Sequence, residues 1–268
     1  MPYLDLPTHR LHYRVEADVA DNSDKPWLIF CNSLGTDLHM WDGQIAYFGQ
    51  DFRVLRYDRR GHGLSSAPTP PYELADLGND VIALMDALSI ERANFCGLSI
   101  GGLTGQWLGV HAGQRLSKLV VCATAARIGT EDGWKSRIDS VRQSGLGPMR
   151  SGTAERWFSP AFVADNPDKV NAILDKFETT SQDGYVGCCA ALAGADLTAD
   201  LSRLTVPVLA VSGNDDPVCP PVDLADIASA VRNGRHISLA GRHIINIESA
   251  ASFNKIVGDF LLSQSTPT

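Results

Sequence analysis

The sequence lacks the features that would direct it to nucleic acid or a membrane. It has 23 Lys and Arg against 31 Asp and Glu, and the resulting charge of -8 disfavours a phosphate backbone as partner. No apolar run reaches the roughly 18 residues that span a bilayer, and the first residues lack the basic and then apolar pattern of a secretory signal. We therefore expect a cytoplasmic protein that binds neither nucleic acid nor membrane.

Cysteine spacing gives a further exclusion. The six cysteines include no C-x-x-C pair, and Cys31, Cys96 and Cys122 lie inside apolar runs that resemble strands. Paired cysteines or zinc ligands would be expected in more regular spacings. We expect reduced and mostly buried thiols.

Six short apolar runs recur along the chain and predict the strands of a sheet. They are "WLIFC" (27–31), "RVLRYD" (53–58), "ANFCG" (93–97), "KLVVCA" (118–123), "VPVLAVSG" (206–213) and "RHISLA" (235–240). Near-continuous apolar character is typical of parallel strands covered on both faces by helices. The earlier run "LHYRVEA" (11–17) alternates in polarity, which favours an antiparallel edge strand.

Helical periodicity fills the intervals between these runs. Apolar residues recur at three- and four-residue steps in 77–88, 103–111, 224–231 and 251–262. Strand alternating with helix predicts a doubly wound α/β sheet. The alternation stops over 126–204, which is too long for an ordinary crossover and is helical throughout. We expect a core of 1–125 and 205–268 and a helical cap of 126–204.

Ser99 is the candidate nucleophile. It lies in Gly97-Leu98-Ser99-Ile100-Gly101, between a predicted strand and a predicted helix. A nucleophile on such a sharp turn needs flanking glycines, because a β-carbon would clash with the neighbouring strand and helix. The competing interpretation is a glycine-rich loop with an incidental serine.

A base and an acid must follow Ser99, because a serine hydroxyl is a weak nucleophile by itself. His243 follows the last strand, and Asp215 and Asp216 follow the strand before it. Both positions lie at carboxyl ends of strands, where open α/β sheets form their sites. Between the two aspartates the chemistry leaves the choice open, and at most one orients the imidazole. His62 is the best rival base, but it precedes Ser99 between turn-forming glycines, and we expect it to be structural.

Two backbone N–H groups are candidates for an oxyanion hole. Ile100 follows the nucleophile at the start of its helix. The second donor is expected from the loop after the first buried parallel strand, "CNSLGTDLHMWD", where we select Leu34.

These motifs together resemble those of the α/β-hydrolase superfamily, and within it the 3-oxoadipate enol-lactonases of aromatic-ring degradation. The resemblance rests on "NSLGTD" with a following Trp, "YDRRGHGLS", "GLSIGG", "GNDDPVCP" and "AGRHIINIE", in that order. It extends over nearly the whole chain. "AGRHIINIE" departs from the family pattern at Arg242, where a small residue is usual. The superfamily pattern Gly-x-x-Asp implies that the acid is Asp216.

The resemblance implies the α/β-hydrolase fold and the opening of an enol-lactone that carries a free carboxylate. Because the chain is acidic overall, such a substrate requires a local cation. The candidates are Arg127 and Arg137 at the start of the cap, with Trp134 as an apolar wall, and also Arg142 and Arg242. No metal or cofactor is expected, since the His9 and His12 pair has no third ligand.

Other functions use the same motifs. A carboxylesterase, a perhydrolase or a carbon–carbon bond hydrolase would retain the Ser, Asp and His set. A hydrolase-like receptor of another functional class would retain it without appreciable turnover. Serine at position 99 argues against the dehalogenases and epoxide hydrolases of this fold, which need aspartate there.

Overall fold

The core of the protein is one eight-stranded, mostly parallel sheet. The computed structural model describes residues 2–16 and 24–263, and the strands lie in the order β1-β2-β4-β3-β5-β6-β7-β8. They are β1 (Tyr3–Asp5), β2 (Arg10–Glu16), β3 (Trp27–Cys31), β4 (Arg53–Tyr57), β5 (Ala93–Leu98), β6 (Leu116–Cys122), β7 (Val208–Gly213) and β8 (Gly234–Leu239). β1 pairs antiparallel with β2, β2 pairs antiparallel with β4, and the remaining neighbours pair parallel.

The predicted doubly wound sheet is confirmed. The run 11–17 was predicted to be an antiparallel edge strand; it forms the antiparallel β2, but β1 pairs with its outer side, so β1 and not β2 is the edge strand. Ala17 of that run lies outside the described residues.

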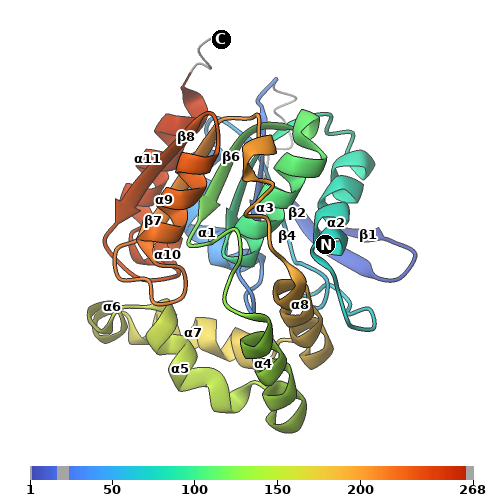
Figure 1. The fold of residues 1–268 in the computed structure, drawn as a ribbon, viewed down its shortest axis with the longest axis vertical. Helices are drawn as coiled ribbons and strands as arrows, with labels where there is room; N and C mark the ends of the chain where they lie inside the picture. The colour runs from blue at the N-terminus through green and yellow to red at the C-terminus, as the bar shows by residue number, and fades with distance from the viewer. Residues whose placement is uncertain (1, 17–23, 264–268) are drawn as a thin grey trace.

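Burial explains why the apolar runs became the central strands. Every residue of β5 and of β7 is buried, because helices cover both faces of the sheet (Figure 1). The sequence analysis missed β1, which has only three residues, none of them fully buried.

Two layers of helices cover the sheet. α1 (Asp42–Phe48) packs against α11 (Ala250–Leu262), and α2 (Leu74–Ala87) packs against α3 (Ile100–His111). α9 (Pro221–Ala230) contacts β7 and β8, and the short α10 (Ile245–Glu248) precedes α11. The start of α2 is set by a capping box, in which the side chains of Glu73 and Asp76 each accept a backbone N–H of the other.

A group of helices separates β6 from β7. It consists of α4 (Glu131–Ser144), α5 (Arg150–Trp157), α6 (Pro160–Asp165), α7 (Pro167–Glu178) and α8 (Gln182–Gly194). Figure 1 shows these helices together at one end of the sheet, drawn below it. α4 packs against α8 and α5 packs against α7. The cavity described below lies between this layer and the sheet.

α8 lies directly on a loop of the core at Gly61 and Gly184. A β-carbon on Gly61 would lie 2.1 Å from Cα of Gly184, and one on Gly184 would lie 2.2 Å from the Gly61 carbonyl oxygen. Gly61 also has a φ of +72°, which favours glycine. The two backbones are therefore in contact with no space for a side chain.

All six cysteines are unpaired and buried, as predicted. Within 2–16 and 24–263, no helix has the length and apolar character needed to cross a membrane. In the same ranges, no group of three or more His, Cys, Asp or Glu side chains is arranged to hold a metal ion.

Candidate active site

Ser99 lies on a sharp turn between β5 and α3. Its backbone has φ 60° and ψ −122°, a conformation that non-glycine residues rarely adopt. A β-carbon on Gly97 would lie 2.1 Å from the carbonyl oxygen of Gly101, and one on Gly101 would lie 2.4 Å from that of Cys31. Both glycines are therefore required by close backbone approach, as the sequence analysis expected.

His243 and Asp216 form a buried pair. His243 Nδ1 lies 2.8 Å from Asp216 Oδ2, and both side chains are at most 3% exposed. The other carboxylate oxygen of Asp216 accepts the backbone N–H groups of Val218 and Cys219 at 2.8 and 3.2 Å. Asp215 is exposed, and it is Asp216 that reaches the imidazole.

The loops that carry this pair are bonded to each other. The N–H of Asn214 donates to Leu239 O at 2.8 Å, and that of Asp215 donates to Gly241 O at 3.0 Å. A β-carbon on Gly213 would lie 2.3 Å from the carbonyl oxygen of Arg242. The glycine that ends β7 thus lets the loop that carries Asp216 approach the loop that carries His243.

Leu34, the predicted second oxyanion donor, lies at the cavity that contains Ser99. Leu34, Ser99 and His243 line the same cavity. Within the described part of the chain, the N–H groups of Leu34 and Ile100 have no protein acceptor. The next N–H along the loop, that of Gly35, is already bonded to His62 Nε2 at 3.0 Å. Of these two neighbouring N–H groups, that of Leu34 is thus the one without a protein acceptor among the described residues.

His62 lies behind this loop rather than in the cavity. Burial, together with the nearby charge of Arg59, lowers its pKa from 6.5 to about 3. It is therefore neutral at ordinary pH and acts as an acceptor for Gly35. This placement agrees with the structural role expected for it.

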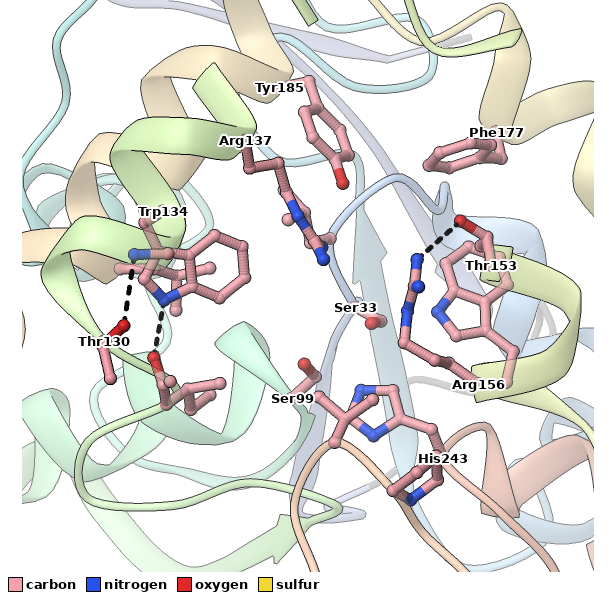
Figure 2. A pocket seen from close by; sticks show the side chains of 18 residues that line it. Ser33, Ser99, Thr130, Trp134, Arg137, Thr153, Arg156, Phe177, Tyr185 and His243 are labelled. Atoms are coloured by element: carbon pink, nitrogen blue, oxygen red, sulfur yellow. Dashed lines mark hydrogen bonds between the residues drawn. The ribbon is translucent and has the colours of Figure 1, made fainter. Parts of the chain in front are cut away.

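The cavity above Ser99 has a volume of about 380 Å³, which is within the usual size of small-molecule sites. Figure 2 shows Ser99 and His243 on its floor, with side chains of α4, α5, α7 and α8 around it. The apolar part of its wall includes Trp134, Trp157, Phe177 and Leu192. Such a cavity has room for a small organic molecule beside Ser99.

Two arginines face this cavity. Arg137 comes from α4 and Arg156 from α5, and Figure 2 shows both side chains extending toward the space above Ser99. Neither has a carboxylate within ion-pair distance among the described residues. The Arg137 guanidinium lies 5.0 Å from the ring centroid of Trp134, and Arg156 donates to Thr153 Oγ1 at 3.2 Å. The site therefore has positive charge available for an anionic ligand.

The pKa values of Arg156 and Tyr185 are shifted by burial and by the charges of the neighbouring arginines. Burial, and then repulsion from Arg137, lowers the pKa of Arg156. Burial raises the pKa of the Tyr185 hydroxyl, and the neighbouring Arg137 and Arg156 oppose that rise. A carboxylate placed between the two guanidinium groups would relieve their repulsion.

The other predicted arginines lie outside the cavity. Arg127 was expected to bind substrate, but its half-exposed guanidinium lies 3.7 Å from Asp196 and it does not line the cavity. Arg142 is exposed, and the Arg242 guanidinium is bonded to the backbone carbonyl of Glu155. Arg156 was not predicted from the sequence, since helical periodicity alone does not show which face of α5 meets the cavity.

The fold and this geometry agree with the comparisons to known proteins. Residues 26–250 match the family model described as the alpha/beta hydrolase fold. The chain belongs to this family. It is 45% identical over 235 residues to 3-oxoadipate enol-lactonase 2 of Acinetobacter baylyi, with 88% of each chain covered.

Two further alpha/beta hydrolases give the same result. The chain is 36% identical over 256 residues to 3-oxoadipate enol-lactonase 1 of Acinetobacter baylyi, with 96% of each chain covered. A crystal structure of the enol-lactonase from Burkholderia xenovorans LB400 has a TM-score of 0.95 and 41% identity, covering 98% of this chain and all of that one. The resemblance to enol-lactonases inferred from the motifs is confirmed.

Proposed function

We propose that this alpha/beta hydrolase opens 3-oxoadipate enol-lactone to 3-oxoadipate. The observation that carries the proposal is the joining, in one cavity, of Ser99 and His243 with Arg137 and Arg156. A lactone that bears a free carboxylate needs a nucleophile and base for its ring ester and a positive charge for its carboxylate. The similarity to two enol-lactonases over most of the chain supports the same substrate.

Ser99 is the nucleophile in this mechanism. His243 takes the proton of Ser99 Oγ, which attacks the lactone carbonyl carbon, and Asp216 holds the imidazole and stabilises its positive charge. The N–H groups of Leu34 and Ile100 stabilise the negative oxygen of the tetrahedral intermediate. The intermediate collapses as the ring C–O bond breaks and an enolate departs.

The leaving group makes the first half of the reaction favourable. An enolate oxygen leaves more easily than an alkoxide, and it becomes a ketone when its carbon takes up the proton that His243 received from Ser99, which returns His243 to its neutral form. Water, deprotonated by His243, then attacks the ester formed on Ser99. The C–O bond to Ser99 breaks, Oγ regains its proton from His243, and 3-oxoadipate is released.

Arg137 and Arg156 bind the free carboxylate of the substrate in this proposal, and Trp134 forms an apolar wall. The indole N–H of Trp134 donates to Ile128 O at 2.6 Å, so its ring is fixed in place at the cavity wall. We further propose that 126–204 acts as a cap and 1–125 with 205–268 as the catalytic core. The expectations of a cytoplasmic location and of no nucleic-acid or membrane partner stay predictions.

The test is hydrolysis of 3-oxoadipate enol-lactone, followed as 3-oxoadipate formation, by wild type and Ser99→Ala. Simple aryl esters are assayed in parallel. Because nucleophile and base act as a unit, Ser99→Ala should lower kcat by several orders of magnitude. Good ester turnover with slow lactone turnover would instead indicate a carboxylesterase. Ligand-induced stabilisation without product would indicate a receptor.

A further inference from the structure

The oxyanion loop is held from behind by two side chains of the "YDRRGHG" segment. Arg59 Nη2 donates to the carbonyl of Asn32 at 2.5 Å, and its Nη1 donates to that of Ser33 at 3.3 Å. His62 Nε2 accepts the N–H of Gly35 at 3.0 Å. The peptide groups on either side of the Leu34 N–H are thus fixed by buried side chains.

The peptide group that carries the Leu34 N–H is polarised by these contacts. Its oxygen, Ser33 O, accepts from Arg59 and also from the hydroxyl and N–H of Thr36, at 2.9 and 3.4 Å. Donors on a carbonyl oxygen strengthen the N–H of the same peptide as a donor, because hydrogen bonds in a chain polarise one another. The positively charged guanidinium of Arg59, hydrogen-bonded to the Ser33 oxygen, therefore makes the Leu34 N–H a stronger donor to an oxyanion.

Arg59 is an unusual residue to bury for packing alone. It is 1% exposed, and among the described residues no carboxylate lies within ion-pair distance of it. Its polar neighbours are backbone carbonyls and the Cys31 thiol. A buried charge without an opposite charge is costly to keep. Negative charge that develops on the far side of the Ser33–Leu34 peptide would be stabilised by it.

His62 holds the peptide group that follows Leu34, because it accepts the N–H of Gly35. Its Nδ1 lies 3.2 Å from the carbonyl oxygen of Arg60, so the neutral tautomer that donates there leaves Nε2 free to accept from Gly35. Gly35 has a φ of +74°, and a β-carbon on it would lie 2.6 Å from the Phe177 ring. With the Gly35 N–H occupied by His62, the neighbouring Leu34 N–H is left as the candidate donor to an oxyanion at Ser99.

We propose that Arg59 and His62 are positioning residues that orient and polarise the Leu34 N–H for the transition state. This inference rests on the proposed function, because it takes Leu34 as the oxyanion donor for attack by Ser99. Neither residue lines the cavity, so both act through the loop and not on the substrate itself.

The experiment compares two ligands of the site. A carboxylate-bearing trifluoromethyl ketone forms a tetrahedral adduct with Ser99 and needs the oxyanion hole, whereas the product 3-oxoadipate does not. Arg59→Met should weaken ketone inhibition by about tenfold or more, a fraction of the effect of deleting a donor. The inhibition constant of 3-oxoadipate should not change. In turnover, kcat should fall with KM unchanged, and Arg59→Lys should recover part of the loss.

A matched control is Arg56→Met. Arg56 is also buried, but it binds Leu38 O, Asp42 and Glu16, and among the described residues none of its hydrogen bonds or ion pairs is with Asn32, Ser33 or Gly35, the residues around the Leu34 N–H. It should leave the ratio of the two inhibition constants at the wild-type value. His62→Gln and His62→Leu supply a second pair, since glutamine has an oxygen that can accept the Gly35 N–H and leucine has none. We expect ketone inhibition to weaken with leucine and to recover with glutamine, and this pair decides the matter if Arg59→Met does not fold.

Two results would overturn the proposal. One is an unchanged ratio of the two inhibition constants in the folded Arg59 and His62 variants. The other is equal weakening of both ligands, which would indicate general damage to the site. The wild-type enzyme tests the proposed function separately. If it binds the ketone no more tightly than Ser99→Ala does, the mechanism through Ser99 fails whatever the Arg59 and His62 variants show.

Discussion

His243 Nδ1 lies 2.8 Å from Asp216 Oδ2, and the imidazole is therefore held in one orientation by a carboxylate that is fully buried. Two backbone N–H groups fix the same carboxylate from the other side. The orientation of the His243 imidazole is thus set by the loop after β7.

Asp216→Asn should lower kcat by about 10⁴-fold, because an amide at this position favours the wrong tautomer of His243. The measurement is steady-state hydrolysis of the lactone at saturating substrate. Asp215→Asn is the matched control, since Asp215 is adjacent but exposed. Equal losses in the two variants would contradict the assignment of the acid.

Arg156→Met should raise KM for the lactone by about tenfold to a hundredfold, since a hydrogen bond to a charged group contributes about 1.5–3 kcal/mol. Arg137→Met should act in the same direction. Arg142→Met, on the exposed face of α4, should leave KM unchanged. A substrate analogue with its free carboxylate esterified should be insensitive to all three changes, and sensitivity to Arg156→Met there would argue against carboxylate binding.

His62 should make the protein less stable as pH falls. Its pKa is about 3 in the folded protein against an ordinary 6.5, so between these values the unfolded chain binds a proton that the folded chain does not. The free energy of unfolding should therefore fall as pH is lowered from about 6.5, by at most about 1.4 kcal/mol per pH unit from this group. Urea unfolding at pH 7 and pH 5 measures the slope.

His62→Gln should remove this part of the pH slope, whatever it does to stability at pH 7. His111→Gln is the control, because it makes the same substitution at an exposed histidine. A wild-type slope retained in full by His62→Gln would show that other groups cause it.

Gly101→Ala should destabilise the protein by several kcal/mol, because its β-carbon would overlap the carbonyl oxygen of Cys31 and force the strand-to-helix turn apart. Thermal unfolding measures the change. Gly43→Ala is the control: it lies in α1 with no atom within 4 Å of the new β-carbon. Alanine should stabilise that helix by about 0.5–1 kcal/mol.

The core was predictable because burial on both faces leaves a direct trace in the sequence. β3 begins and ends where "WLIFC" does, and the turn at Ser99 is marked by glycines that the backbone requires. Leu34 and His243 follow from their places after strands. Their roles, and that of Ser99, stay predictions until activity is measured.

The cavity walls were not predictable in the same way. Arg127 and Arg137 both begin the cap in sequence, yet Arg127 lies near Asp196 and only Arg137 lines the cavity. Arg156 comes from α5, and its position depends on how α5 packs against α7. Such contacts between helices leave no periodic signal, since each helix needs only one apolar face to pack. The three-residue β1 was missed because it is too short for a pattern.

The contact between Gly61 and Gly184 has a consequence for engineering by recombination. A chimera that took α4–α8 from a different hydrolase would succeed only if the incoming helix also presented a glycine opposite Gly61. Any larger residue would push the transplanted helices away from the sheet and enlarge the cavity above Ser99. Crossover points for a library that exchanges α4–α8 should therefore keep positions 61 and 184 from the same parent.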